Sequence, residues 1–310
     1  MSRREYIWKK NKKMIITIFG ITTVTAGSFV AGAWMKDRAL EQQEQRRIEE
    51  KAEEERQKEQ EKISRIEENL CNSPYEAELR TLYEEYPQLE EMLLQLEFYS
   101  DELVEYLIKV PDAVDWVIAY PKYSVMTDEE RSKMALEPLE MEKYEMHGQV
   151  PIFYQWDTTW GYAGYGNGYM AMTGCAPTCL SMAAVALTGD TGITPKMVAN
   201  VSEAMDAYID DVGTSWELMT EGARSLGIES QKIEKWSVKA IQSALAEGKI
   251  VICSMGEGDF TTQGHFILIV GETEDGRFVV NDPNSKSNTH KAWDGQDMLD
   301  QMKGMWALSI

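Results

Sequence analysis

The stretch GCAPTCLSM contains the cysteines best placed for nucleophilic chemistry, Cys175 and Cys179. Cys175 precedes Ala-Pro-Thr and a run of apolar residues with helical spacing. Proline is favoured in the first helical turn, where its missing N–H costs nothing, so Cys175 should lie at or just before a helix N-terminus. The positive end of the helix dipole favours the thiolate, which is the nucleophilic form of cysteine. Cys179 lies one turn further on, where we expect a buried, inert thiol; a structural role is also the alternative for Cys175.

A nucleophilic thiolate needs a positioned base, and the chain has three histidines, at positions 147, 265 and 290. The segments HFILIVG and RFVVND predict two strands joined by a turn at ETEDG. Folding this hairpin about Glu274 and Asp275 places His265 next to Asp282 on the neighbouring strand. A carboxylate beside an imidazole fixes its tautomer and stabilises its cation. Cys175, His265 and Asp282 are therefore predicted as nucleophile, base and orienting residue.

The other polar residues near this motif receive different predictions. Asn281 should point to the opposite face of its strand, and His147 and His290 are expected at the surface. An acyl-transfer site also needs donors for the oxyanion, such as the backbone N–H of Cys175 and a side-chain amide. Gln155, at the end of the predicted strand VPIFYQWD, is the candidate amide, although a purely structural glutamine is the alternative.

Metal and cofactor chemistry is not indicated by the sequence. No histidine pair has the spacing of zinc ligands. The segment DPNSKSN has a serine, Ser287, where a calcium loop needs glycine for its sharp turn. The glycine-rich segment WGYAGYGNGYM is predicted as a loop, but its GYGNG opens no phosphate-binding helix. We therefore expect no metal and no cofactor.

The charge of the chain is strongly negative and unevenly distributed. The net charge is −21, yet residues 1–40 contain eight Lys or Arg against two Asp or Glu, which leaves −27 on the remaining 270 residues. A surface this acidic repels phosphate backbones, so nucleic acid is not an expected partner.

The basic N-terminal residues precede an uncharged segment of 21 residues, Met14–Trp34. About 20 helical residues span a bilayer core, so residues 14–34 predict a transmembrane anchor. The lysines before it, at positions 9, 10, 12 and 13, favour a cytoplasmic N-terminus, residues 1–13, and a single-pass protein whose remainder lies outside the cytoplasm. A signal peptide cleaved near Ala31–Ala33 and a secreted protein are the alternative.

The rest of the chain divides by composition into three parts. Residues 35–71 are charged with sparse apolar positions and no sustained heptad seam, which predicts a solvated helical stalk. Residues 72–146 are expected to form a helical segment, with two or three short amphipathic helices in residues 72–120, broken at Pro87 and Pro111, and a tether with at least one helical turn after them. From residue 147 to 310, helices followed by a run of strands predict an α+β domain.

The motifs of residues 148–310 resemble the papain-like cysteine peptidases related to bacteriocin-processing double-glycine leader peptidases, in their stand-alone form. The resemblance rests on VPIFYQWD, GCAPTCLSM, GHFILIVG and VVNDP in this order. It implies a papain-like fold, in which a nucleophile helix packs on an antiparallel sheet. It also implies that Cys175 is the nucleophile, His265 the base, Asp282 the orienting residue and Gln155 the oxyanion glutamine. Ala176 departs from the glycine more usual in the family.

Two alternatives to a membrane-anchored cysteine peptidase stay open at the level of sequence. The first is a cell-wall amidase, endopeptidase or acyl transferase, because all of these use the same acyl-enzyme chemistry. The second is a catalytically inactive surface binding module on a peptidase scaffold. The sequence predicts a peptide or cell-wall peptide substrate, but neither its identity nor the oligomeric state.

Overall fold

The computed structural model describes residues 31–210 and 212–310, which divide into two units at the boundary between Ser64 and Arg65. The segment Met14–Trp34, predicted as a membrane anchor, lies almost entirely outside the described residues. Across the described ranges, no helix has both the length and the apolar character needed to cross a membrane.

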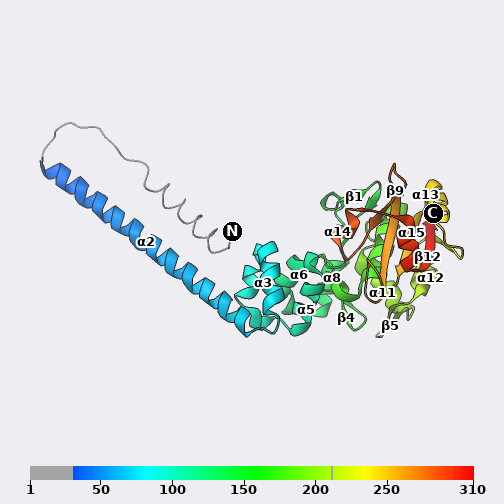
Figure 1. The fold of residues 1–310 in the computed structure, drawn as a ribbon, viewed down its shortest axis with the longest axis horizontal. Coiled ribbons are helices and arrows are strands. Elements are labelled where there is room, and N and C mark those ends of the chain that lie inside the picture. Colours follow the sequence, from blue (N-terminus) through cyan, green and yellow to red (C-terminus); the bar gives the residue numbers. More distant parts are fainter. Residues whose placement is uncertain (1–30, 211) are drawn as a thin grey trace. The chain divides into compact units, whose positions relative to one another are not determined.

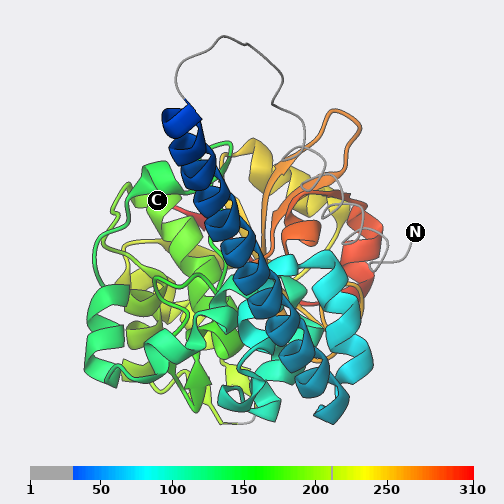
Figure 2. The ribbon, with the colours of Figure 1, turned by 90° about the vertical axis from the view of Figure 1, so that its left-hand side faces the viewer.

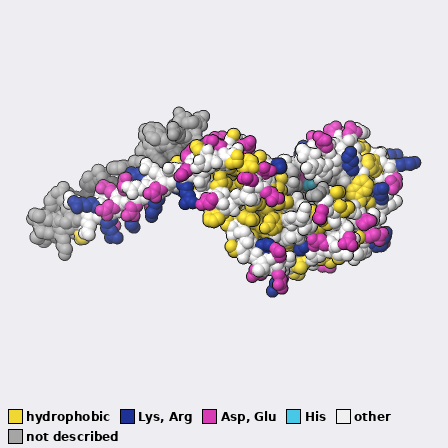
Figure 3. Space-filling model, turned by 90° about the horizontal axis from the view of Figure 1, so that it is seen from below, with side chains coloured by type: hydrophobic (Ala, Val, Ile, Leu, Met, Phe, Trp, Pro, Cys, Tyr) yellow, Lys and Arg dark blue, Asp and Glu magenta, His cyan; other side chains and the backbone are white. Residues whose placement is uncertain are grey.

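A single long helix, α2 (Ala31–Asn72), includes the segment predicted as a stalk (Figures 1 and 2). Acidic and basic side chains are interspersed along it (Figure 3), and nearly all of those described are exposed. Arg56 and Glu53, for example, form an exposed ion pair at 2.7 Å. Exposed ion pairs of this kind each contribute little to the stability of a helix. The apolar positions of α2 are too sparse to form the continuous apolar seam of a coiled coil.

The helical segment between α2 and the sheet consists of short elements rather than long helices. Pro87 and Pro111 each begin a 3₁₀ turn, because proline lacks the N–H that would continue the preceding helix. Ser100 caps the N-terminus of the helix that follows it by accepting a hydrogen bond from the Leu103 N–H. The elements are α3 (Glu76–Glu85), η1 (Pro87–Leu89), α4 (Glu90–Leu93), η2 (Leu96–Phe98), α5 (Asp101–Lys109), η3 (Pro111–Ala113), α6 (Val114–Ile118), α7 (Tyr120–Ser124), α8 (Asp128–Ala135) and η4 (Met141–Lys143).

A six-stranded antiparallel sheet forms the centre of the C-terminal domain, with strand order β11-β10-β9-β8-β12-β7. The strands are β7 (Glu229–Lys232), β8 (Ile250–Met255), β9 (His265–Glu272), β10 (Phe278–Asn281), β11 (Ala292–Trp293) and β12 (Met302–Ser309). The predicted strands β8, β9 and β10 are present, whereas β12, which pairs with β8 and completes the sheet, was not predicted.

Helices cover both faces of this sheet, and the two-residue period of the strands decides which residue faces which helix. Ile252 and Leu268 share a core with α10 (Cys175–Thr188). Their neighbours Val251 and Ile267 share a second core with α13 (Val238–Ala246) and α15 (Gly295–Gln301). Because β8 and β9 are covered on both sides, they read as continuous apolar runs rather than as alternating ones. The result is the mixed helix-and-sheet architecture that the sequence predicted.

Of two sequence predictions before α10, the strand that opens VPIFYQWD is present but shorter than expected, and the glycine-rich loop is wrong. Only β2 (Val150–Pro151) of the segment VPIFYQWD is a strand, paired with β1 (Met146–His147). Beyond it the backbone leaves the ladder, because Phe153 and Trp156 insert into two different cores. The segment predicted as a glycine-rich loop instead forms the hairpin of β3 (Gly164–Tyr165) and β4 (Gly168–Tyr169), where Gly166 has φ +60°.

The remaining elements lie before α10, between α10 and the sheet, and between β10 and β11. They are α9 (Met170–Thr173), α11 (Pro195–Ala204), β5 (Tyr208–Ile209), β6 (Gly213–Thr214), η5 (Trp216–Met219), α12 (Glu221–Ser225) and α14 (Lys286–Thr289). Of these, α11 packs against α10 and holds it on the sheet.

Candidate active site

Cys175 is the first residue of α10, as the sequence predicted. Its thiol is half-buried, whereas the next ten residues of the helix are buried. Gly174 precedes it as the N-cap residue, and a Cβ at this position would lie 2.4 Å from the Met170 backbone oxygen. Glycine therefore lets α9 turn directly into α10, which leaves the Cys175 sulfur at the helix N-terminus, where backbone N–H groups lack helical partners.

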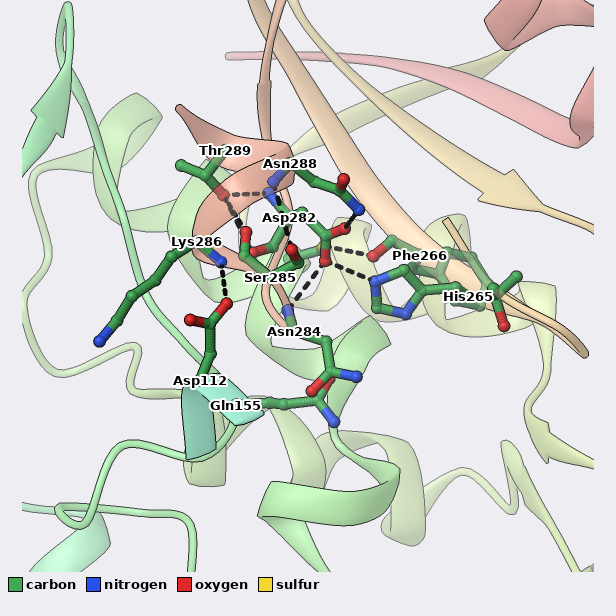
Figure 4. Close-up of polar contacts among 12 residues, drawn as sticks. Asp112, Gln155, His265, Phe266, Asp282, Asn284, Ser285, Lys286, Asn288 and Thr289 are labelled. Atoms are coloured by element: carbon green, nitrogen blue, oxygen red, sulfur yellow. Dashed lines mark hydrogen bonds and ion pairs between the residues drawn. The ribbon is translucent and has the colours of Figure 1, made fainter. Parts of the chain in front are cut away.

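His265 is the first residue of β9 and contacts Asp282, which directly follows β10. The distance between His265 Nε2 and Asp282 Oδ1 is 2.7 Å, and the two side chains are 6% and 1% exposed (Figure 4). Because Nε2 is engaged by the carboxylate, Nδ1 is the ring nitrogen left for another partner. The contact predicted from the hairpin is thus present.

The pKa of His265 is the net result of opposing effects. Burial lowers it, while the Asp282 charge and hydrogen bonds to Asp282 and Cys175 raise it, and the net effect raises the pKa of His265 to about 10. The Asp282 carboxylate and the Cys175 thiol thus both act on the pKa of this imidazole. This environment favours an imidazolium, which a neighbouring thiolate would stabilise further.

Asp282 is held by the turn that follows it. Its Oδ1 accepts a hydrogen bond from the Asn284 backbone N–H at 2.8 Å, and its Oδ2 accepts one from Asn288 Nδ2 at 2.8 Å (Figure 4). Thr289 Oγ1 lies 3.0 Å from the Asp282 nitrogen and accepts from it. From the sequence, this segment is interpreted only as a calcium loop that lacks its glycine. Its repeated Asn and Ser residues, which favour side-chain to backbone turns, were the available signal.

Gln155 lies beside the same turn. Its backbone N–H donates to the Pro283 oxygen at 2.7 Å, which ties it to the residue after Asp282. The side chain is 2% exposed, and its Nε2 donates to the Ala171 backbone oxygen at 2.7 Å. Its Oε1 is buried and has no hydrogen-bond partner among the described residues. One of the two Nε2 protons is therefore donated to Ala171.

The other cysteines, all in the described part of the chain, lack such surroundings. None of the four forms a disulfide. Cys179 Sγ donates to the Phe266 oxygen at 3.2 Å, and burial raises its pKa well above the usual value. Burial raises the pKa of Cys253 as well, and Cys71 is exposed on α2. Cys175 thus combines partial exposure with a histidine neighbour.

His147, His290 and Asn281 lie outside this arrangement. Asn281 points away from His265, as predicted, and its Nδ2 donates to the Pro151 oxygen at 3.0 Å. His147 is half-buried rather than a free surface residue, because its Nδ1 lies 2.7 Å from Asn281 Oδ1. His290 Nε2 lies 3.7 Å from a Glu145 carboxylate oxygen at an exposed site.

Two other kinds of site were sought in the described residues. Within residues 31–210 and 212–310, no group of three or more His, Cys, Asp or Glu side chains is arranged so that it could hold a metal ion. A surface cavity of about 450 Å³ lies at the opposite end of β9, between Gln242, Lys249 and Glu272. Its lining includes none of Cys175, His265, Asp282 and Gln155, so it is separate from the candidate active site.

Residues 147–308 match the Peptidase_C39 like family, and the matched range contains Cys175, His265, Asp282 and Gln155. It begins after the helical segment α3–α8. No curated protein matches the chain.

Proposed function

Because the chain belongs to the Peptidase_C39 like family, we propose that it is a cysteine peptidase that hydrolyses amide bonds through Cys175, His265 and Asp282. The observation that carries this proposal is the buried contact between His265 Nε2 and Asp282 Oδ1 next to the thiol at the start of α10. That arrangement leaves Nδ1 of His265 to exchange a proton with Cys175.

The proposed reaction has two steps. In the first, the Cys175 thiolate attacks the carbonyl carbon of the substrate amide, and His265 donates its proton to the leaving amine as the C–N bond breaks. In the second, His265 removes a proton from water, the hydroxide attacks the thioester and the C–S bond breaks, so that Cys175 leaves as a thiolate, the product acid is released and His265 is again protonated. Asp282 orients the imidazole and stabilises its cation throughout.

Both steps pass through a tetrahedral oxyanion that needs hydrogen-bond donors. We assign this role to the Cys175 backbone N–H and to the second proton of Gln155 Nε2. Gln155 is fixed by its Ala171 contact, so its amide does not have to be ordered during the reaction. A donor oriented in advance stabilises developing charge at little cost in reorganisation.

We also propose that residues 14–34 anchor the protein in a membrane and that the peptidase domain acts outside the cytoplasm. The uncharged segment Met14–Trp34 and the lysines before it support this location. The exposed helix α2 is then a solvated spacer between bilayer and enzyme. A protease-protection assay on intact cells would test this: digestion of the C-terminal domain only after lysis would contradict it.

The enzymatic proposal is tested by comparing the full-length protein with its Cys175→Ala variant on a panel of peptides and cell-wall peptide fragments. We expect the wild type to cleave at least one class and Cys175→Ala to cleave none while keeping its melting temperature. Cys71→Ala is the matched control, because Cys71 is exposed and makes no contact with the candidate site. Turnover by Cys175→Ala would reject the mechanism. The class of fragment cleaved separates a peptidase from a cell-wall amidase.

Thiol labelling distinguishes an enzyme from an inactive binding module. Iodoacetamide followed by peptide mapping resolves Cys175 from the exposed Cys71. We expect Cys175 to be alkylated faster than Cys71, and this excess to disappear in His265→Ala, because the imidazolium no longer stabilises the thiolate. Equal rates at the two cysteines in the wild type would favour the binding module.

A further inference from the structure

The helical segment upstream of the family match packs directly against the residues that precede Cys175. Trp116 of α6 is fully buried and stacks on Tyr162, with 4.9 Å between ring centroids. Tyr162 also stacks on Tyr123 of α7, with centroids 4.2 Å apart. Trp156, Tyr162 and Ala171 thereby belong to the same buried core as α3–α7. The segment from Trp156 to Ala171 is therefore fixed in part by helices that lie outside the matched range.

One side chain of the helical segment reaches the candidate active site itself. Tyr106 of α5 is 9% exposed, and its hydroxyl donates to the Ala171 backbone oxygen at 2.5 Å. Gln155 Nε2 donates to the same oxygen at 2.7 Å. A carbonyl oxygen has two lone pairs, so the phenol and the amide together saturate this acceptor.

Further contacts connect Tyr106 and its neighbours with the Asp282 turn. Asn284 Oδ1 lies 3.4 Å from the Tyr106 hydroxyl, and the Asn284 backbone N–H donates to Asp282. Asp112, in η3, accepts a hydrogen bond from the Lys286 backbone N–H at 2.8 Å (Figure 4). Burial raises the pKa of Tyr106. Its phenol stays protonated and remains a donor at neutral pH.

We propose that Tyr106 is a positioning residue for the Gln155 amide, which makes the helical segment α3–α7 part of the active site. This inference rests on the proposed function, in which Gln155 donates to the oxyanion. By occupying one lone pair of the Ala171 oxygen, the Tyr106 hydroxyl fixes the peptide against which Gln155 is oriented. Gln155 donates one Nε2 proton to this fixed carbonyl, and its second Nε2 proton is directed to the substrate. Tyr106 acts through Gln155 and does not itself contact the reacting atoms.

The test is Tyr106→Phe in the full-length protein, which removes one hydroxyl and keeps the ring. We expect kcat to fall about tenfold, as for the loss of one well-formed hydrogen bond, with KM nearly unchanged. Tyr99→Phe is the matched control, because the Tyr99 hydroxyl donates to the Ile118 oxygen at 2.9 Å within the same core and touches no site residue. Tyr99→Phe should keep the wild-type kcat.

A double variant separates positioning from a general structural effect. If Tyr106 acts through Gln155, adding Tyr106→Phe to Gln155→Ala should cause no further loss of kcat. Independent, multiplicative losses would overturn the inference, as would an unchanged kcat in Tyr106→Phe alone.

A readout without turnover keeps the inference separate from the proposed function. The Gln155 side-chain amide protons can be assigned in a ¹⁵N correlation spectrum as the signals lost in Gln155→Ala. We expect them to shift in Tyr106→Phe but not in Tyr99→Phe. Unshifted signals in Tyr106→Phe overturn the inference even in an active enzyme. A wild type that cleaves nothing, with no selective Cys175 labelling, rejects the proposed function while a shift still supports the Tyr106–Gln155 coupling.

Discussion

His265 and Asp282 lie 17 positions apart in the sequence, yet their side chains meet at 2.7 Å in the protein interior. The pairing of β9 and β10 brings them close, since Leu268 pairs with Asn281, and His265 and Asp282 lie three positions and one position beyond that pair. Both side chains are almost completely excluded from solvent. A charge-assisted hydrogen bond in such surroundings fixes the orientation of the ring and the identity of the nitrogen that faces Cys175.

Replacing the carboxylate by an amide should weaken this arrangement without destroying it. In Asp282→Asn the side-chain oxygen can still accept from His265 Nε2, while Asn288 can flip its amide to face the new NH₂ group. We expect kcat/KM at pH 7 to fall about tenfold, and at least about a hundredfold in Asp282→Ala, which no longer orients the ring. Steady-state kinetics with circular dichroism to verify folding would measure both. Equal activity of the alanine variant and the wild type would exclude an orienting role.

The raised pKa of His265 predicts a pH-dependent stability. Folding raises this pKa from 6.5 to about 10, so the folded protein binds the proton more tightly than the unfolded chain. The stabilisation is fully present below about pH 6.5 and is lost as the pH rises toward about 10. Urea unfolding between these pH values should show a declining free energy of unfolding in the wild type and a flatter profile in His265→Gln. His290→Gln, at an exposed site, should decline as the wild type does. A decline of the same size in His265→Gln would contradict the assignment.

Local sequence patterns were sufficient to predict the thiol, the imidazole and the carboxylate. The start of α10 depends on a Gly-Cys-x-Pro sequence within a few residues, and the His265–Asp282 contact depends on one hairpin. The residues that set the start of α10 are neighbours in the chain, and His265 and Asp282 are related by the two-residue period of a single hairpin. Burial of β8 and β9 was likewise visible as continuous apolar runs.

The residues that support the site could not be predicted, because their contacts join distant parts of the chain. Tyr106 and Ala171 are 65 positions apart, and no periodicity of α5 indicates which of its buried residues carries a hydroxyl to Ala171. The segment VPIFYQWD has the composition of a strand, but tertiary packing of Phe153 and Trp156 overrides that propensity. Its departure from the ladder is what allows the Gln155 N–H to bond with Pro283.

Removing the Gln155 amide should reduce the rate of the chemical step more than substrate binding. In Gln155→Ala we expect kcat to fall about a hundredfold, the usual effect of losing one oxyanion donor, with a small change in KM. Gln242→Ala is the control, because Gln242 Nε2 donates to Glu272 at an exposed site at the other end of β9. Pre-steady-state measurement of acyl-enzyme formation would locate the effect. A rise in KM with unchanged kcat would show that Gln155 binds substrate and not the transition state.

The close packing of Gly161 against Trp116 gives a prediction for the interface between the helical segment and the peptidase domain. A Cβ at position 161 would lie 2.8 Å from both the Asp157 oxygen and Trp116 Cδ1. Neither a backbone oxygen nor a fully buried indole can move freely, so Gly161→Ala should destabilise the protein by about 1–3 kcal/mol. The loss should extend to catalysis, because the Gly161 oxygen accepts a hydrogen bond from the Ala171 N–H at 3.0 Å. A shift of the Gly161 backbone would therefore move Ala171, whose carbonyl oxygen accepts the hydrogen bond from the Gln155 amide.

The matched control for this variant is Gly164→Ala in β3, where a new Cβ would have open space around it. Urea unfolding should place Gly164→Ala close to the wild type and Gly161→Ala clearly below it. Under conditions in which Gly161→Ala stays folded, its kcat should still be lower than that of Gly164→Ala, while iodoacetamide labelling of Cys175 should be equally fast in both, since His265 and Asp282 are untouched. A Gly161→Ala protein that is as stable and as active as Gly164→Ala would show that the helical segment does not constrain the active site.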